Sequence, residues 1–323
     1  ARYEMRGGDV VIGEGEIVEI DRPQRIVQTM RALWSEDVKA EGTSRITWDI
    51  EAVGDSCRLT LTHDQLRDVN PAIVCAHLSA YGRDNARAKW PGYDYLMQAE
   101  AGFCALTGDP DGEPQRMGLS IVDFMTGTMM AVGLLAALVD AQRTGLGRDV
   151  DLDLLSAAIH QTSYPALWYM NEGDVTARTP RSAHPSATPS QMFSSADGWM
   201  FIMCQLPKFW DILIDKIGRP DLARDLRFSN EANRLANRGA LSDILDAIFR
   251  TQPTAHWQAL LEGFVPVAPV YQLDQALDNP WLDTIGMTDT VSHPDREELR
   301  VLASPIRIDG QRLPNRAGPL LGQ

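Results

Sequence analysis

The hydrophobic pattern of this chain changes character near residue 65, and that change constrains the fold more than any other feature. Before it, short β-branched segments alternate apolar and polar residues between Gly-, Pro- and Asp-rich turns. These segments are residues 10–12, 16–20, 25–28, 45–50 and 58–62. Period-two alternation is typical of strands with one buried and one solvated face. The first part therefore predicts an antiparallel β-meander.

After residue 65 the pattern alternates apolar strands with longer helices. Strands are expected at residues 72–78, 150–154, 198–203 and 265–270. Helices are expected at 95–105, 124–142, 209–217, 234–250, 254–262 and 273–277, and a further helix follows the strand at 150–154 and ends at residue 160. Alternation of this kind indicates an α/β fold, α+β overall once the meander is included. The chain has 323 residues, which fits two domains. We predict a boundary between residues 1–65 and 66–323.

Charge and cysteine usage restrict the class of function. The formal net charge is −14 and the pI is about 4.8, which disfavours nucleic acid as a partner. None of the four cysteines has zinc-ligand spacing. Cys75, Cys104 and Cys204 lie in apolar runs, so we expect buried, reduced thiols. We also expect a cytoplasmic protein without a signal peptide.

The most apolar run, residues 124–139, is shorter than the ~20 residues that a membrane span needs. It predicts a buried helix and no membrane partner. Asp123 comes directly before this helix. One explanation is an N-cap, because Asp oxygens accept the free amides of a first helical turn. The other is a nucleophile that the helix start keeps ionised in apolar surroundings.

Two further groups of acidic residues allow more than one explanation. Tyr93 and Asp94 follow Pro91-Gly92, so Asp94 could cap a helix, or the pair could orient a substrate near Asp123. Asp149, Asp151 and Asp153 alternate along a predicted strand. A calcium loop would need a glycine after the third acidic position, so we predict no metal site and assign Asp153 to a helix cap.

Taken together in this order, the motifs after residue 65 resemble family III CoA-transferases of the CaiB/BaiF type. The matching segments are Tyr81-Gly82, residues 91–94, 106–112, 123–127, 143–151, 184–185, 196–199, 265–270 and 319–322. The family includes formyl-CoA and carnitine CoA-transferases and α-methylacyl-CoA racemases. The resemblance implies acyl-CoA and a carboxylic acid as substrates, no tightly bound cofactor, and a homodimer.

The resemblance also implies roles for individual residues. Asp123 matches the nucleophilic aspartate, which forms covalent acyl and CoA intermediates. Tyr93 and Asp94, with Tyr81 and Gly82, match positions that bind the CoA thioester. In the racemase branch a histidine stands at the position of Tyr93 and exchanges a proton. Tyrosine, with an ordinary pKa near 10, is a poor base at pH 7, so a transferase is preferred to a racemase or dehydratase.

The first 65 residues resemble the C-terminal part of a START-like domain of Hsp90-ATPase-activator homologues. The matching segments are residues 13–17, 46–50 and 59–63. This partial sheet stands where family III enzymes carry a Rossmann-like segment that forms much of the CoA pocket. A non-catalytic binding protein is therefore the third hypothesis.

Overall fold

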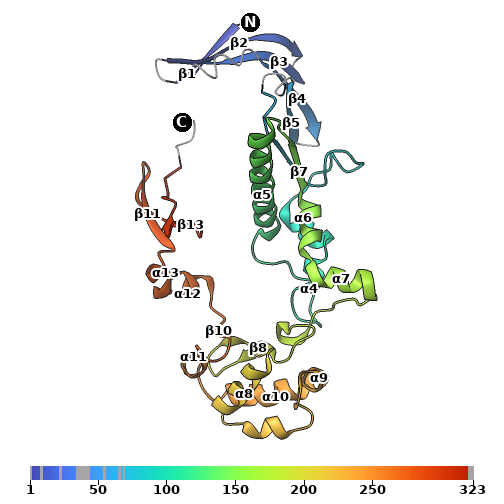
Figure 1. The fold of residues 1–323 in the computed structure, drawn as a ribbon, viewed down its shortest axis with the longest axis vertical. Coiled ribbons are helices and arrows are strands. Elements are labelled where there is room, and N and C mark those ends of the chain that lie inside the picture. Colours follow the sequence, from blue (N-terminus) through green and yellow to red (C-terminus); the bar gives the residue numbers. More distant parts are fainter. Residues whose placement is uncertain are drawn as a thin grey trace. The chain divides into compact units, whose positions relative to one another are not determined.

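The computed structural model describes residues 2–318 except 8–9, 22–23, 34–43, 54–55, 65–66 and 68–69. The predicted boundary at residue 65 and the motif at 319–322 lie outside the described residues. The chain divides into two compact units, Ala1–Arg178 and Thr179–Gln323. The elements follow the sequence as drawn in Figure 1.

The N-terminal segment forms the predicted antiparallel meander, in the order β1-β2-β3-β4-β5 (Figure 1). Its strands are β1 (Arg2–Gly7), β2 (Val10–Asp21), β3 (Arg25–Ala32), β4 (Ser44–Val53) and β5 (Ser56–Asp64). Two predicted strands are joined in β2, and β1 was missed because three of its six residues are charged. Buried and exposed residues alternate along β2, where Gly13 is buried and Glu14 and Glu16 are exposed. This alternation indicates one covered and one solvent-exposed face.

The rest of the first unit contains a parallel strand pair and five helices among the described residues. They are β6 (Cys75–Ser79), α3 (Asp94–Glu100), α4 (Phe103–Leu106), α5 (Ile121–Thr144), β7 (Asp149–Asp153), α6 (Leu154–Gln161) and α7 (Ser163–Glu172). The single helix predicted over residues 95–105 is split at Gly102, whose φ of 88° is left-handed.

Three burial predictions, for a strand, a helix and the thiols, were wrong in whole or in part. The strand predicted as buried over residues 72–78 is shorter, and Leu78 on β6 is 53% exposed. The helix expected to be buried is α5, and its buried positions are confined to one narrow stripe. Of the three thiols expected to be buried, Cys204 is buried, whereas Cys75 and Cys104 are only half-buried.

Helix α5 is also longer than its apolar run suggested. It has 24 residues and ends at Gly145, whose φ of 71° allows a left-handed C-cap. By length and composition it could cross a membrane, with a mean hydropathy of 1.8 over its most apolar window and 22% of that window buried. Core helices of soluble proteins pass the same test.

The second unit carries a three-stranded antiparallel sheet, β10-β9-β8, with helices around it (Figure 1). Its elements are η1 (Pro180–Ser182), β8 (Ser190–Ser194), β9 (Trp199–Met203), α8 (Pro207–Lys216), η2 (Pro220–Arg224), α9 (Glu231–Ala236), α10 (Arg238–Phe249), α11 (Thr254–Leu261), β10 (Val267–Pro269), α12 (Leu273–Leu277), α13 (Pro280–Thr284), β11 (Thr288–His293), β12 (Arg296–Leu302), β13 (Arg307–Ile308) and β14 (Gln311–Arg312). The helix predicted over residues 234–250 is broken at Asn237 into α9 and α10.

The core of the second unit is built on aromatic side chains. Phe193 on β8, Phe249 on α10 and Trp257 on α11 pack edge to face, with ring centroids 5.2 Å apart in each successive pair. The Trp257 indole also donates to the Phe249 carbonyl oxygen at 2.7 Å. These contacts fix the C-terminal end of α10 against the sheet.

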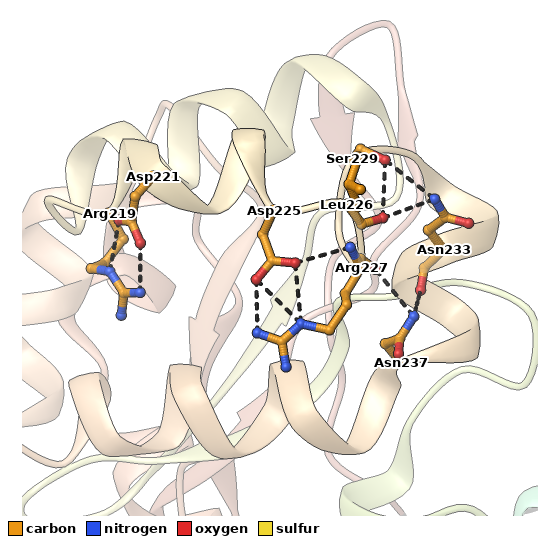
Figure 2. A network of polar contacts seen from close by, with 8 residues as sticks. All are labelled: Arg219, Asp221, Asp225, Leu226, Arg227, Ser229, Asn233 and Asn237. Atoms are coloured by element: carbon orange, nitrogen blue, oxygen red, sulfur yellow. Dashed lines mark hydrogen bonds and ion pairs between the residues drawn. The ribbon is translucent and has the colours of Figure 1, made fainter.

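The loop that enters α9 is held by short-range polar contacts (Figure 2). Arg227 pairs with Asp225 at 2.7 Å, and the Asn233 amide donates to the Leu226 carbonyl and the Ser229 hydroxyl. The ion pairs are exposed and contribute little stability. The amide contacts matter more, because they fix the turn that places Phe228 in the core.

Candidate active site

The carboxyl ends of the parallel strands β6 and β7 bring the predicted site residues into one region. Pairing runs from Cys75 opposite Asp149 to Ser79 opposite Asp153. Tyr81 and Gly82 follow β6, and α6 starts directly after β7. The Leu155 amide donates to the Ala80 carbonyl oxygen at 3.1 Å, which ties these two ends together. Ligands commonly bind at this edge of a parallel sheet.

A small core joins this edge to the starts of α3 and α5. Met97 and Val122 are fully buried in it, and Tyr81 and Ile121 pack against it. The predicted residues Tyr81, Asp94 and Asp123 therefore converge on one cluster, although they are far apart in sequence.

Asp94 caps α5 rather than its own helix. Its Oδ2 accepts the amides of Val122 at 2.7 Å and Asp123 at 3.0 Å. Its Oδ1 accepts the Gln98 side-chain amide at 2.6 Å. The carboxylate is 4% exposed, so its charge is satisfied by these three donors in place of water. Of the alternatives left open by the sequence, the N-cap explanation therefore holds neither for Asp94 in α3 nor for Asp123 in α5.

Asp123 lies in the first turn of α5 and is exposed. We expected the helix start to favour its ionised form, but the net effect is the opposite. Partial burial raises the pKa of Asp123, and the negative charge of Asp94 raises it further. Because the amides of Val122 and Asp123 already bind Asp94, they are not free to hold the Asp123 carboxylate. The result is a more basic carboxylate that solvent can reach.

The remaining predicted residues surround the end of β6. The Tyr81 hydroxyl donates to Glu100 Oε2 at 3.1 Å, and Arg87 lies over the Tyr81 ring, 5.4 Å from its centroid. Burial and the hydrogen bond to Glu100 raise the pKa of Tyr81. Gly82 has a φ of 90°, and a Cβ there would approach the Asn85 side chain to 2.9 Å. Tyr93 is 75% exposed directly before Asp94.

The alternating aspartates of β7 bind basic or backbone groups. Asp149 pairs with Arg67 at 2.8 Å, and Asp151 accepts from Arg83 Nη2 at 2.8 Å. The prediction that Asp153 caps a helix is confirmed, since its Oδ1 accepts the Ser156 amide at 2.8 Å. The described residues hold no group of three side chains suited to a metal ion.

Sequence reasoning missed Gln98, which is completely buried. Its Nε2 donates to Asp94 and to the Leu119 carbonyl at 3.0 Å, and its Oε1 accepts the Met117 amide at 2.9 Å. Gln98 therefore holds the segment before α5 against Asp94. The available signal was its spacing of four residues from Asp94 on one helix, a common Gln–Asp contact.

Comparison with known families follows the division seen in the sequence. The family described as "CoA-transferase family III" matches residues 50–323. The chain belongs to CoA-transferase family III. A second family, "Activator of Hsp90 ATPase homolog 1-like protein", matches residues 1–77. The two matches overlap from β4 to β6.

Curated relatives of this family III chain are CoA-transferases. It is 32% identical over 225 residues to acetyl-CoA:oxalate CoA-transferase of Acetobacter aceti, covering 69% of this chain and 58% of the relative. It is 30% identical over 268 residues to succinyl-CoA:mesaconate CoA-transferase of Haloarcula hispanica, covering 81% of this chain and 67% of the relative. The chain therefore spans about 58–67% of the length of these two relatives.

Solved structures agree with the family III fold. A CAIB/BAIF family protein from Brucella suis matches with a TM-score of 0.66 and 28% identity, over 78% of this chain and 66% of that one. Rv3272 of Mycobacterium tuberculosis matches with a TM-score of 0.68 and 28% identity, over 77% of this chain and 66% of that one. The expected mixed α/β fold with an N-terminal antiparallel sheet is confirmed.

Proposed function

We propose that this family III chain transfers coenzyme A from an acyl-CoA to a carboxylic acid, with Asp123 as the covalent nucleophile. The observation that carries the proposal is the pair Asp94–Asp123. One carboxylate is buried and fully bonded, and it presents the other, exposed and with a raised pKa, on the first turn of α5. A raised pKa makes the ionised carboxylate a stronger nucleophile.

The reaction that fits this pair proceeds through anhydrides and a thioester. Asp123 attacks the thioester carbonyl carbon, the C–S bond breaks, and CoA leaves as a thiolate. The thiolate attacks the aspartyl carbonyl carbon, releases the donor carboxylate and leaves an aspartyl-CoA thioester. The acceptor carboxylate attacks the aspartyl carbonyl carbon of that thioester, and CoA leaves as a thiolate, which gives a second anhydride. The returning thiolate then attacks the acceptor acyl carbon of this anhydride. New acyl-CoA leaves, and the Asp123 carboxylate is regenerated.

The other residues have supporting roles in this proposal. Tyr81 packs against the same small core, and we assign it, together with Gly82 and Tyr93, to binding of the CoA thioester. Asp94 positions Asp123, because both of its oxygens are already occupied by protein donors. Tyr93, a poor base at neutral pH, favours group transfer over racemisation.

The test is to trap the covalent intermediate by mass spectrometry. The protein is incubated with acetyl-CoA or succinyl-CoA and hydroxylamine, which converts an aspartyl anhydride or thioester to a hydroxamate. We expect the hydroxamate on Asp123, and none in Asp123→Asn. Asp174→Asn, which changes an exposed carboxylate elsewhere in the same unit, serves as the matched control. Labelling of another carboxylate, or none with either acyl-CoA, would contradict the proposal.

A further inference from the structure

A small cavity with several polar side chains in its lining lies in the second unit between η1, β8 and the start of α10. Its volume is about 200 Å³, and its lining includes Arg181, Gln191, Arg238, Ser242 and Asp243. A water molecule occupies ~30 Å³ in the liquid, so the cavity has room for a molecule of several heavy atoms. The opening turn of α10 contributes the positive end of a helix dipole.

Two hydrogen-bond donors at this cavity have no acceptor among the described residues. Gln191 is 1% exposed, and its Oε1 accepts the Ser242 hydroxyl at 3.1 Å. Its Nε2 has no partner among the residues that the structure describes, and the same is true of Arg181 Nη1. Buried donors are costly unless a ligand or water accepts from them.

The region of the cavity holds two arginines and two carboxylates, and both carboxylates lie beside the same arginine. Arg181 is paired with Asp246 at 2.7 Å and lies 3.6 Å from Asp243. Arg238 donates to the Thr188 hydroxyl at 2.9 Å and to backbone carbonyls of the preceding loop, all of them neutral acceptors. Within the described part of the chain it forms no ion pair, and burial lowers the pKa of Arg238. A partly buried cation without a counter-ion favours an anion in the adjoining space.

We propose that this cavity binds a small oxyanion, a carboxylate or a phosphate. One oxygen accepts from Gln191 Nε2 and another from Arg181 Nη1, while the negative charge balances Arg238. A side-chain amide and a guanidinium donor beside a helix start suit either anion. Asp243 at the rim opposes binding, because its carboxylate shares the cavity with the ligand.

The experiment is isothermal titration calorimetry of the full chain at constant ionic strength, with sodium malonate, sodium phosphate and neutral malonamide. We expect malonate or phosphate to bind and malonamide not to bind. The preferred anion identifies the source of the ligand. Heat from malonamide equal to that from malonate, or no heat from either anion, would overturn the proposal.

Two variants with opposite expected effects locate the binding. Gln191→Glu replaces the free donor by a negative charge and should weaken binding at least about tenfold. Asp243→Asn removes the opposing charge, and should tighten binding severalfold. The Asp243 side chain is 79% exposed, so this variant folds even if the change at the buried Gln191 impairs folding. Affinities that stay unchanged in Asp243→Asn and in a folded Gln191→Glu would refute this location.

Discussion

At the scale of single residues, the charge of Asp123 affects stability as well as chemistry. Burial and Asp94 raise its folded-state pKa above the ordinary value of 3.8. A carboxyl group with a raised folded pKa contributes fully to stability below its unfolded pKa. That contribution is lost as the pH rises through the folded pKa. At neutral pH the ionised Asp123 therefore destabilises the folded chain.

The first prediction follows from this destabilisation at neutral pH. Asp123→Asn should be more stable than the parent at about pH 7, by about 0.5 kcal/mol or less at this exposed position. The gain should shrink as the pH falls below the folded pKa. Urea denaturation from about pH 3 to about pH 7 measures it.

Asp221 provides the matched control, with the opposite sign. The guanidinium of Arg219 lowers the pKa of Asp221, so its contribution is present above the unfolded pKa and lost as the pH falls. Asp221→Asn should therefore be less stable than the parent at neutral pH, and the difference should disappear in acid. Parallel pH profiles for the two variants would be inconsistent with these environments.

The second prediction concerns Cys204. It is completely buried, and burial raises the pKa of its thiol to about 12. Thiolates, not thiols, react with alkylating agents. We expect iodoacetamide at pH 8 to modify Cys104, which is partly exposed, before Cys204, and to reach Cys204 only after denaturation. Peptide mass spectrometry measures the order; early labelling of Cys204 in folded protein would contradict its placement.

At the scale of elements, Gly147 sets the approach of the segment before β6 to the start of β7. Its amide donates to the Pro71 carbonyl at 2.6 Å. A Cβ at Gly147 would lie 1.6 Å from the Ile73 carbonyl oxygen. This contact is with backbone, which cannot rotate away as a flexible side chain does.

The third prediction is that Gly147→Ala destabilises the chain by about 1–3 kcal/mol, because the two backbones are forced apart. Gly127, inside α5, has open space at its Cβ position. Gly127→Ala should stabilise the chain by about 0.4–1 kcal/mol through lower chain entropy. Urea denaturation of both variants measures the contrast. Equal effects of the two changes would show that the strands tolerate a wider spacing.

The elements also show what the sequence could predict. Helix α5 was predicted over residues 124–142, because an apolar run is a local signal. The break at Asn237 was not, because neither glycine nor proline marks it. The cap of α5 by Asp94 was also missed, since that contact joins residues 28 and 29 positions apart. Composition likewise could not show which side of α5 is buried, because burial depends on distant partners.

At the scale of the whole molecule, the chain combines parts that match two families, and its family III part covers only a portion of its relatives' length. Among the described residues, β6 and β7 form a parallel pair without further strands. Parallel sheets are usually larger and covered on both faces. The exposed Leu78 on β6 is consistent with a surface that lacks its usual cover.

Helix α5 also exposes apolar side chains, and they are more numerous there. Phe124, Val132, Leu135 and Val139 are spaced by three, four or eight residues, so they share one face, and each is at least 56% exposed. Monomeric soluble proteins rarely expose an apolar stripe of this length without a function for it. We define these four residues as the α5 stripe.

The last prediction is that the α5 stripe makes the isolated chain self-associate. Hydrophobic burial between copies is favourable, so sedimentation velocity should show mass rising with concentration, and the dye ANS should fluoresce on the protein. The double variant Val132→Gln/Leu135→Gln should reduce both signals, because glutamine keeps the helix propensity and removes the apolar surface. Leu226→Gln, at a position 82% exposed in the second unit, is the matched control and should leave both signals unchanged.

Because α5 is long and apolar enough to cross a membrane, the same proteins are also mixed with lipid vesicles. Monomers at every concentration without dye binding would mean that the stripe does not drive association, and flotation with the vesicles would mean that lipid covers it.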